Sequence, residues 1–438
     1  MSPLELTSLR QVSKALYTHA NSEFHWQRHV QSNVPGNTIT RPYPFETFRE
    51  LYACHDPFWF IPKHKIWFSD RGLAGELIVV QYDQRRGVLE GYQLVAISPG
   101  EAGEFWQAHG DLAVFVDDFE PEVKLHRDKP ILKLSPADHQ LRSEVGTSSS
   151  SPRRKFFPVQ PMSLDIDTDP RVGEVVAAKP LASVLEDNIP KTFPYGYVWP
   201  PPTIPAGHRV GAQAAGVLPI SSQRLELASP GNWAPSNRSE ASDQTFRIRR
   251  WMEWIRSGLG LKLGEETATW STLDPYLYTP TKEKPWRGIY VGDYNVHGCE
   301  FLLVHQPDST EGETEPLERQ AEETDAELEQ RFLHERVYTG SIEAVKLTGD
   351  MNVPRGEYTF IAPDLGDGGL VCIEEESPFA GCRVVRSRGH IAGDGFVNDT
   401  YMPSQLILVS YDRLAQFWMG FRHVSYYQRV NIDRFLVP

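Results

Sequence analysis

Two stretches of alternating apolar and polar residues, each interrupted by a turn, constrain the fold of this chain most strongly. The first is RGIYVGDYNVHGCEFLLVHQ (residues 287–306) and the second is EAVKLTGDMNVPRGEYTFIAPD (residues 343–364). In each, two runs with a period of two residues flank a segment rich in Gly, Asn and Asp, which is typical of a β-hairpin. We therefore expect antiparallel strands here, and neither stretch contains a nucleophile, a set of metal ligands or a phosphate-binding loop.

The first residues predict a pair of helices. Ser2 is placed to cap a helix, with Pro3 at its first position and Glu5 reaching back as in a capping box. A second helix is predicted after Asn21 or Ser22. The expected apolar surface of this pair consists of Leu6, Leu9, Val12, Leu16 and Trp26.

The two stretches also carry a family resemblance. Together with the tail SQLILVSYDRLAQFWMGFRHVSYYQRV, they resemble the carboxy-terminal substrate module of fungal F-box proteins, a group similar to the animal F-box-only protein that binds D-type cyclins for ubiquitination. The resemblance implies a closed, lipocalin-like antiparallel β-barrel. It also implies that residues 1–35 are the last two helices of an F-box, with the family's first helix expected upstream of Met1.

The fold class expected from pattern and resemblance is therefore mainly β with some helix. Residues 36–438 should form the barrel module, with disordered insertions at 135–245 and 307–335. Strands over residues 65–134 and 287–430 are expected to close into one sheet. A helix is predicted from Phe246 to Ile255, and a C-terminal helix is predicted from the spacing of Leu414, Phe417, Trp418 and Phe421.

Composition narrows the function. The net charge of -14 argues against a general nucleic-acid binder and against attraction to anionic membranes. No apolar run reaches the length of a transmembrane helix, which favours the cytosol or nucleus. The four cysteines have no CxxC spacing, so no disulfide framework, metal site or cofactor is expected.

Candidate substrate-binding residues lie in the hairpin turns and on one later strand. Arg386 and Arg388 alternate with small or apolar residues and so share one strand face, which points either into the barrel or outward. A metal role for His297 is disfavoured, because neighbouring Cys299 and Glu300 point to opposite faces of a strand. The full set of candidates is Tyr294, His297, Thr348, Asp350, Arg386 and Arg388.

The sequence thus favours a non-catalytic substrate-recognition subunit of a Skp/cullin/F-box ubiquitin ligase, as the resemblance implies. Its expected partners are a Skp-type adaptor, a cullin scaffold and a protein substrate held through a short peptide. A lipocalin-like carrier of a small apolar ligand is the alternative. An enzyme is disfavoured because no GxSxG, P-loop or HExxH motif is present.

Overall fold

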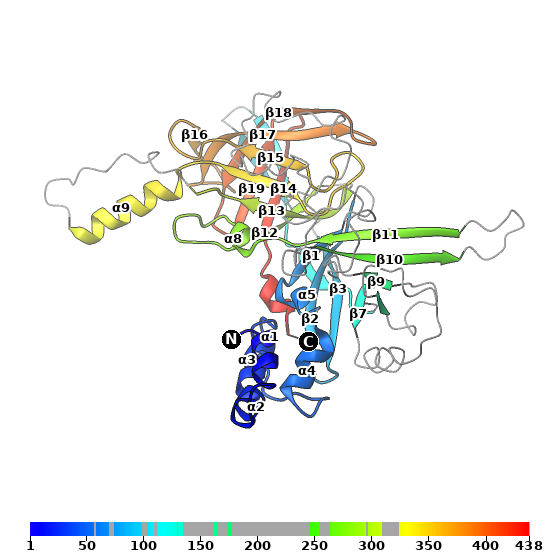
Figure 1. The fold of residues 1–438 in the computed structure, drawn as a ribbon. Coiled ribbons are helices and arrows are strands. Elements are labelled where there is room, and N and C mark those ends of the chain that lie inside the picture. The colour runs from blue at the N-terminus through cyan, green and yellow to red at the C-terminus, as the bar shows by residue number, and fades with distance from the viewer. Residues whose placement is uncertain are drawn as a thin grey trace, which may run out of the picture.

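The structure is a computed structural model. It describes residues 1–56, 58–69, 74–98, 103–108, 112–128, 130–134, 161–163, 174–176, 245–253, 263–294, 297–308 and 324–437. The described chain consists of N-terminal helices, a large open sheet and a closed barrel (Figure 1).

The C-terminal region forms the expected closed antiparallel barrel of eight strands. Its hydrogen-bonded order is β15-β14-β13-β12-β20-β19-β18-β17, and pairing of β15 with β17 closes it. β16 (Leu370–Ile373) adds to β17 outside this ring. The barrel strands are β12 (Gly288–Asp293), β13 (Cys299–His305), β14 (Ile342–Lys346), β15 (Tyr358–Ala362), β17 (Arg383–Gly393), β18 (Val397–Leu408), β19 (Arg413–Trp418) and β20 (His423–Arg429).

One end of the barrel is closed by apolar packing. Inward-facing side chains at this end form a buried cluster that includes Tyr290, Leu302, Phe360, Leu406 and Tyr427. Trp286 joins the same cluster from before β12, and so does Val337 from the end of α9 (Asp325–Val337). Because these large side chains are buried against one another inside the ring, the apolar half of the barrel is packed rather than hollow.

The strands of the N-terminal half form a second, separate sheet. Its order is β6-β3-β2-β1-β11-β10-β9-β8, with β7 also paired to β3. These strands are β1 (Ile66–Ser69), β2 (Leu77–Asp83), β3 (Val88–Ile97), β6 (Glu122–Leu125), β7 (Leu132–Leu134), β8 (Pro161–Ser163), β9 (Glu174–Val176), β10 (Thr245–Glu253) and β11 (Leu263–Ser271).

The expectation of one closed sheet over residues 65–134 and 287–430 is therefore wrong. β1 pairs with β11 instead of with any barrel strand, and β8 and β9 show that the predicted 135–245 insertion contains strands. Alternation in a sequence indicates which face of a strand is buried, but it does not determine with which other strand that strand pairs.

Two predicted helices are also wrong. The segment from Phe246 lies in β10, and the C-terminal stripe forms β19 and the β19–β20 turn. The only helical segment after the barrel is a single 3₁₀ turn, η5 (Ile432–Phe435), among the residues described there. Short apolar runs fit both a period of 3.6 and a buried strand, so periodicity alone does not separate the two.

The N-terminal helices partly match expectation. α1 (Pro3–Leu9) has the predicted Ser2–Glu5 capping box, and α3 (Glu23–Gln31) follows Ser22. A break after Leu9 separates α1 from α2 (Lys14–Ala20), so the predicted stripe from Leu6 to Leu16 belongs to two helices. Together with α4 (Phe48–His55) and α5 (Phe60–Lys63), these helices form one buried cluster with the outer face of β2. Nothing in this packing identifies the helices as an F-box.

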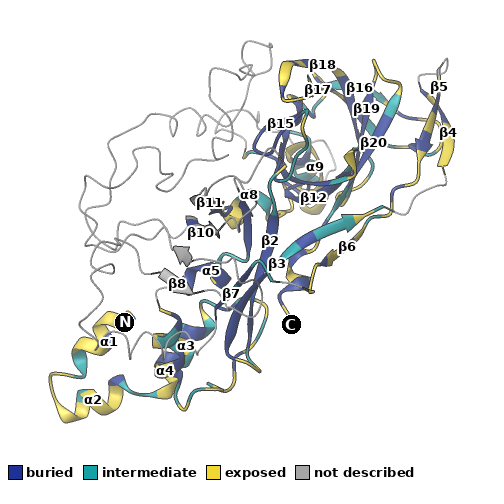
Figure 2. Ribbon diagram, turned by 90° about the vertical axis from the view of Figure 1, so that its right-hand side faces the viewer, coloured by how far each residue is buried: buried dark blue, intermediate teal, exposed yellow. Residues whose placement is uncertain are grey.

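A separate two-stranded hairpin, β4 (Gly103–Ala108) with β5 (Leu112–Asp117), extends from the open sheet onto the barrel (Figure 2). One large apolar cluster contains Trp106 of this hairpin, Phe68 of the open sheet and Phe417 of the barrel. The two sheets therefore share a core. α8 (Pro275–Tyr278) lies between them in the sequence.

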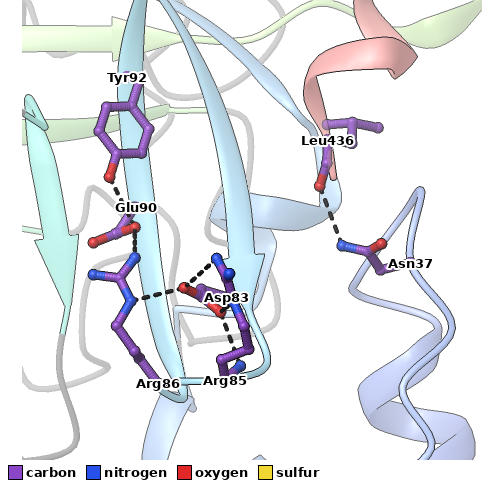
Figure 3. A network of polar contacts seen from close by, with 7 residues as sticks. All are labelled: Asn37, Asp83, Arg85, Arg86, Glu90, Tyr92 and Leu436. Carbon is purple, nitrogen blue, oxygen red and sulfur yellow. Dashed lines mark hydrogen bonds and ion pairs between the residues drawn. The ribbon is translucent and has the colours of Figure 1, made fainter. Parts of the chain in front are cut away.

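Polar contacts stabilise the open sheet and the chain end. At the β2–β3 turn, Arg86 donates to buried Asp83 at 2.7 Å and to buried Glu90 at 2.5 Å, and Tyr92 donates to Glu90 (Figure 3). Near the C-terminus, the Asn37 side chain donates to the Leu436 carbonyl oxygen at 3.3 Å. No helix in the described ranges is long and apolar enough to cross a membrane.

Candidate functional site

Four hairpin turns lie together at one end of the barrel, opposite the end that is closed by the buried apolar cluster around Trp286 and Val337. They connect β12 to β13, β14 to β15, β17 to β18, and β19 to β20. In a ring of antiparallel strands, successive connections alternate between the two ends. These four are every second connection along the chain, so all four project from the same end of the ring. We refer to this as the turn end of the barrel.

A buried lysine lies between two carboxylates at the turn end. Lys346 is the last residue of β14, and its Nζ atom is 2.7 Å from Oε2 of Glu300 and 2.8 Å from Oδ2 of Asp350. The same Nζ atom is 4.2 Å from the centroid of the Tyr294 ring. Lys346 and Glu300 are buried, and Asp350 is largely so. One basic and two acidic side chains are therefore close together and largely shielded from solvent.

The two carboxyl groups have opposite protonation preferences. Burial raises the pKa of Glu300 to about 8 although the Lys346 charge acts to lower it, and the nearby Asp350 carboxylate adds to the rise. Burial also acts to raise the pKa of Asp350, but the Lys346 charge, with hydrogen bonds from Glu300 and from the Val353 N–H, lowers it to about 2. At neutral pH Glu300 therefore holds a proton and Asp350 is the ionised partner of Lys346.

This arrangement predicts a pH dependence of stability. The pKa of Glu300 is raised in the folded state, so the folded protein binds more protons than the unfolded chain between about pH 4.5 and 8, and stability should fall as pH rises through that interval. Glu300→Gln, which keeps the shape of the protonated acid, should remove this fall. Urea unfolding at pH 5.5, 7 and 8.5 measures it, with Glu122→Gln, on an exposed strand end, as the control. An equal pH slope in Glu300→Gln would contradict the assignment.

Hydroxyl and amide groups line the barrel around the lysine. The Tyr294 and Thr359 hydroxyls are 2.6 Å apart. Tyr427 donates to Gln416 Oε1 at 2.8 Å, and Gln416 Nε2 in turn donates to Ser404 Oγ at 3.1 Å. The Ser387 hydroxyl forms a hydrogen bond with the same Ser404 hydroxyl, and the two oxygen atoms are 2.7 Å apart. These bonds pre-orient polar groups inside a low-dielectric barrel, as a site for a polar ligand requires.

Large apolar side chains form an exposed rim around this end. Their exposed fractions are 58% for Met351, 51% for Val397, 45% for Met419 and 60% for Phe421. A hydrogen bond links two of the turns: the Gly395 N–H in the β17–β18 turn donates to the Met351 carbonyl oxygen in the β14–β15 turn at 2.9 Å. Polar groups surrounded by exposed Met and Phe are typical of protein-binding surfaces.

The structure brings only some of the predicted substrate-binding residues together. Tyr294 and Asp350 meet at Lys346. Thr348 has a structural role, because its hydroxyl accepts the Phe301 N–H at 2.9 Å. His297 is exposed in the β12–β13 turn, at the same end.

The two arginines lie elsewhere. Arg386 and Arg388 are exposed on the outer wall, while Ser387 between them faces inward onto Ser404. The interpretation that they point into the barrel is wrong, and the outward interpretation is confirmed. Arg386 is also engaged locally, donating to the Gly368 carbonyl oxygen.

Sequence reasoning missed Lys346 and Glu300. Both lie in the hairpin stretches, at positions where the alternation predicts an inward side chain. A charged residue at an inward strand position was the available signal, because buried charges are rare unless they are paired or functional.

The predicted adaptor-binding residues differ in their exposure. Leu6 and Trp26 are 1% and 3% exposed, and Leu9 and Leu16 are half-buried. Only Val12, at 68%, is fully exposed. The structure instead exposes other apolar side chains on these helices: Leu4 at 80%, Tyr17 at 50% and Phe24 at 66%.

Fold and site together define a binding module built on a closed β-barrel. Within the described ranges, no three His, Cys, Asp or Glu side chains are grouped as metal ligands. Residues 270–434, which run from the end of β11 through the barrel into η5, match the family model described as the cyclin D1 binding domain. The match supports a relation to cyclin D1-binding proteins and a protein-binding role for this region.

A second comparison finds a plant relative. The chain is similar to protein EXECUTER 2, chloroplastic, of Oryza sativa subsp. japonica, with 27% identity over 128 residues. The matched part is 29% of this chain and 17% of the relative, so the chain spans only a small share of that protein. This likeness carries no conclusion about activity.

Proposed function

We propose that this protein is a substrate-recognition subunit of a Skp/cullin/F-box ubiquitin ligase, and that the turn end of its barrel binds a short peptide of the target. The observation that carries the proposal is the rim of exposed Met, Val and Phe at the turn end, in a region matching the cyclin D1 binding domain. A D-type cyclin is the first substrate to test.

The chemistry of the site suits a peptide. Lys346 and Asp350 pair with each other beneath the rim, and Asp350 accepts the Asn352 and Val353 N–H groups, so the β14–β15 turn that presents Met351 is held in one shape. Exposed Met351 and Phe421 offer apolar contacts to neighbouring side chains of the peptide. The rival small-ligand carrier is weakened, because the apolar half of the barrel is filled by its own side chains.

The N-terminal helices would dock the adaptor. Leu4, Val12, Tyr17 and Phe24 give them an exposed apolar surface, which in a folded protein marks an interaction site. In this role the chain contributes proximity between target and ubiquitin carrier, and catalysis belongs to its partners. The proposal places the protein in the cytosol or nucleus.

The test is whether the chain bridges a Skp-type adaptor and a D-type cyclin. Immobilised adaptor should retain the cyclin only when the chain is present. Phe421→Ser, at the rim, should weaken cyclin binding about tenfold or more while adaptor binding stays unchanged, because a central apolar contact is lost. Phe24→Ser should show the reverse.

Arg388→Ala is the matched control, since Arg388 lies on the outer wall. It should leave both interactions intact. Failure of the wild-type chain to bind either the adaptor or the cyclin would refute the ligase role. Loss of cyclin binding in Arg388→Ala, but not in Phe421→Ser, would move the peptide site from the turn end to the outer wall.

A further inference from the structure

The β4–β5 hairpin has one buried face and one exposed aromatic face. Trp106 and Val114 point toward the barrel and are buried there. The alternate positions point away, and they include Phe105, which is 68% exposed, and Phe115, which is 44% exposed. In the structure described, β4 and β5 pair only with each other (Figure 2).

The two exposed rings form a fixed pair. Phe105 and Phe115 are opposite each other in the strand register, and their ring centroids are 5.2 Å apart in an edge-to-face arrangement. The Phe115 ring extends over Gly103, where an added Cβ would lie only 2.8 Å from its Cζ atom. The glycine thus lets the ring lie against the strand, so this aromatic surface is organised before any partner arrives.

The surroundings of the pair are acidic. Residues 88–123 contain eight Asp or Glu and no Lys or Arg. Three of these carboxylates, on Asp117, Asp118 and Glu120, are on exposed residues at the end of β5 or directly after it. Glu104 alternates with Phe105 and lies on the other face, where its carboxylate accepts a hydrogen bond from Ser377 of the barrel region. The nearest basic side chain in the sequence, Lys124, is 3.8 Å from Glu122. The aromatic pair therefore lies in a negative field that no basic side chain of its own segment neutralises.

We propose that this hairpin is a second protein-docking surface, which binds a basic segment of a partner in which Arg or Lys alternates with bulky apolar side chains. The partner's apolar side chains cover Phe105 and Phe115, and its cations lie over the ring faces and beside the carboxylates. Charge complementarity selects this occupant over an acidic or purely apolar one. The surface is distinct from the turn end of the barrel, and it does not depend on the ligase role.

The probe is a short labelled synthetic peptide in which arginine alternates with leucine and phenylalanine. Fluorescence anisotropy with the full chain should show binding that weakens as salt is raised, because part of the attraction is between exposed charges. Phe105→Ser and Phe115→Ser should each weaken binding about tenfold or more, as expected for central aromatic contacts. Asp117→Asn should weaken binding less and reduce its salt dependence.

Two controls separate this surface from others. Phe421→Ser, at the turn end, should leave binding of the basic peptide unchanged. The same peptide with glutamate in place of arginine should not bind. Unchanged affinity in both Phe105→Ser and Phe115→Ser, or equal binding of the glutamate peptide, would overturn the proposal. So would self-association of the wild-type chain in sedimentation that Phe105→Ser abolishes, because the occupant would then be a second copy.

Discussion

Replacing Lys346 by Met is expected to destabilise the protein by about 3–5 kcal/mol. The variant removes the only ammonium within ion-pair distance of Glu300 in the described structure, and it leaves the Asp350 carboxylate beside Glu300 with little solvent. Breaking a buried ion pair from one side costs more than the pair contributes, because the remaining charge stays desolvated. Denaturant unfolding at pH 7, monitored by tryptophan fluorescence, measures the loss.

The matched control removes the charges together. Lys346→Met combined with Asp350→Asn, with Glu300 protonated, removes both charges of the pair and should recover much of the lost stability. The asparagine also keeps an oxygen for the Asn352 and Val353 N–H groups that Asp350 now accepts at 2.6 and 2.7 Å. A single variant that stays within about 1 kcal/mol of wild type would show that the site is hydrated or rearranges easily.

The barrel was predictable because its hairpins carry local signals. Alternation on both sides of the turns at residues 294–298 and 347–357 is visible in the sequence, and both hairpins form where expected. The separate open sheet was not predictable in the same way. Pairing of β1 with β11 joins residues about 200 positions apart, such as Phe68 and Ser271, and no local pattern encodes such a contact.

Only part of the candidate site could be predicted from the sequence, because strand register again decides where side chains point. Tyr294 and Asp350 were identified as turn residues, and the structure places them beside Lys346. Inward or outward orientation depends on the strand register, and the pairing of β14 with β15 shifts register between Ala344 and Val345. The direction of Arg386 and Arg388 likewise depends on which face of β17 meets the barrel interior, and both faces contain polar residues.

The N-terminal helices illustrate a third limit. An apolar stripe predicts a buried face as readily as a docking face, and Leu6 and Trp26 proved to be core residues. Of the side chains available to a partner, Val12 belongs to the stripe, but Leu4 and Phe24 do not. Burial within the chain must therefore be known before an amphipathic helix is interpreted as an interface.

Replacing Trp106 by Ala should have an effect as large as the lysine change, about 3–5 kcal/mol. The Trp106 side chain is fully buried, and its ring makes edge-to-face contacts with Phe379 at 5.0 Å and Phe417 at 5.1 Å. The cavity left by alanine would be lined by barrel side chains, and the hairpin would lose its largest attachment to the barrel. Unfolding by denaturant and hydrogen exchange of the β4–β5 amides measure the two consequences.

The neighbouring residue provides the sharpest control for this prediction. Phe105→Ala removes an aromatic ring of similar size from the same strand, but from the exposed face, so its cost should stay below about 1 kcal/mol. The contrast separates the anchoring face of the hairpin from the face proposed for docking. Equal destabilisation by the two variants would mean that the Phe105–Phe115 pair is part of the folded core, and its exposure would then need no partner to explain it.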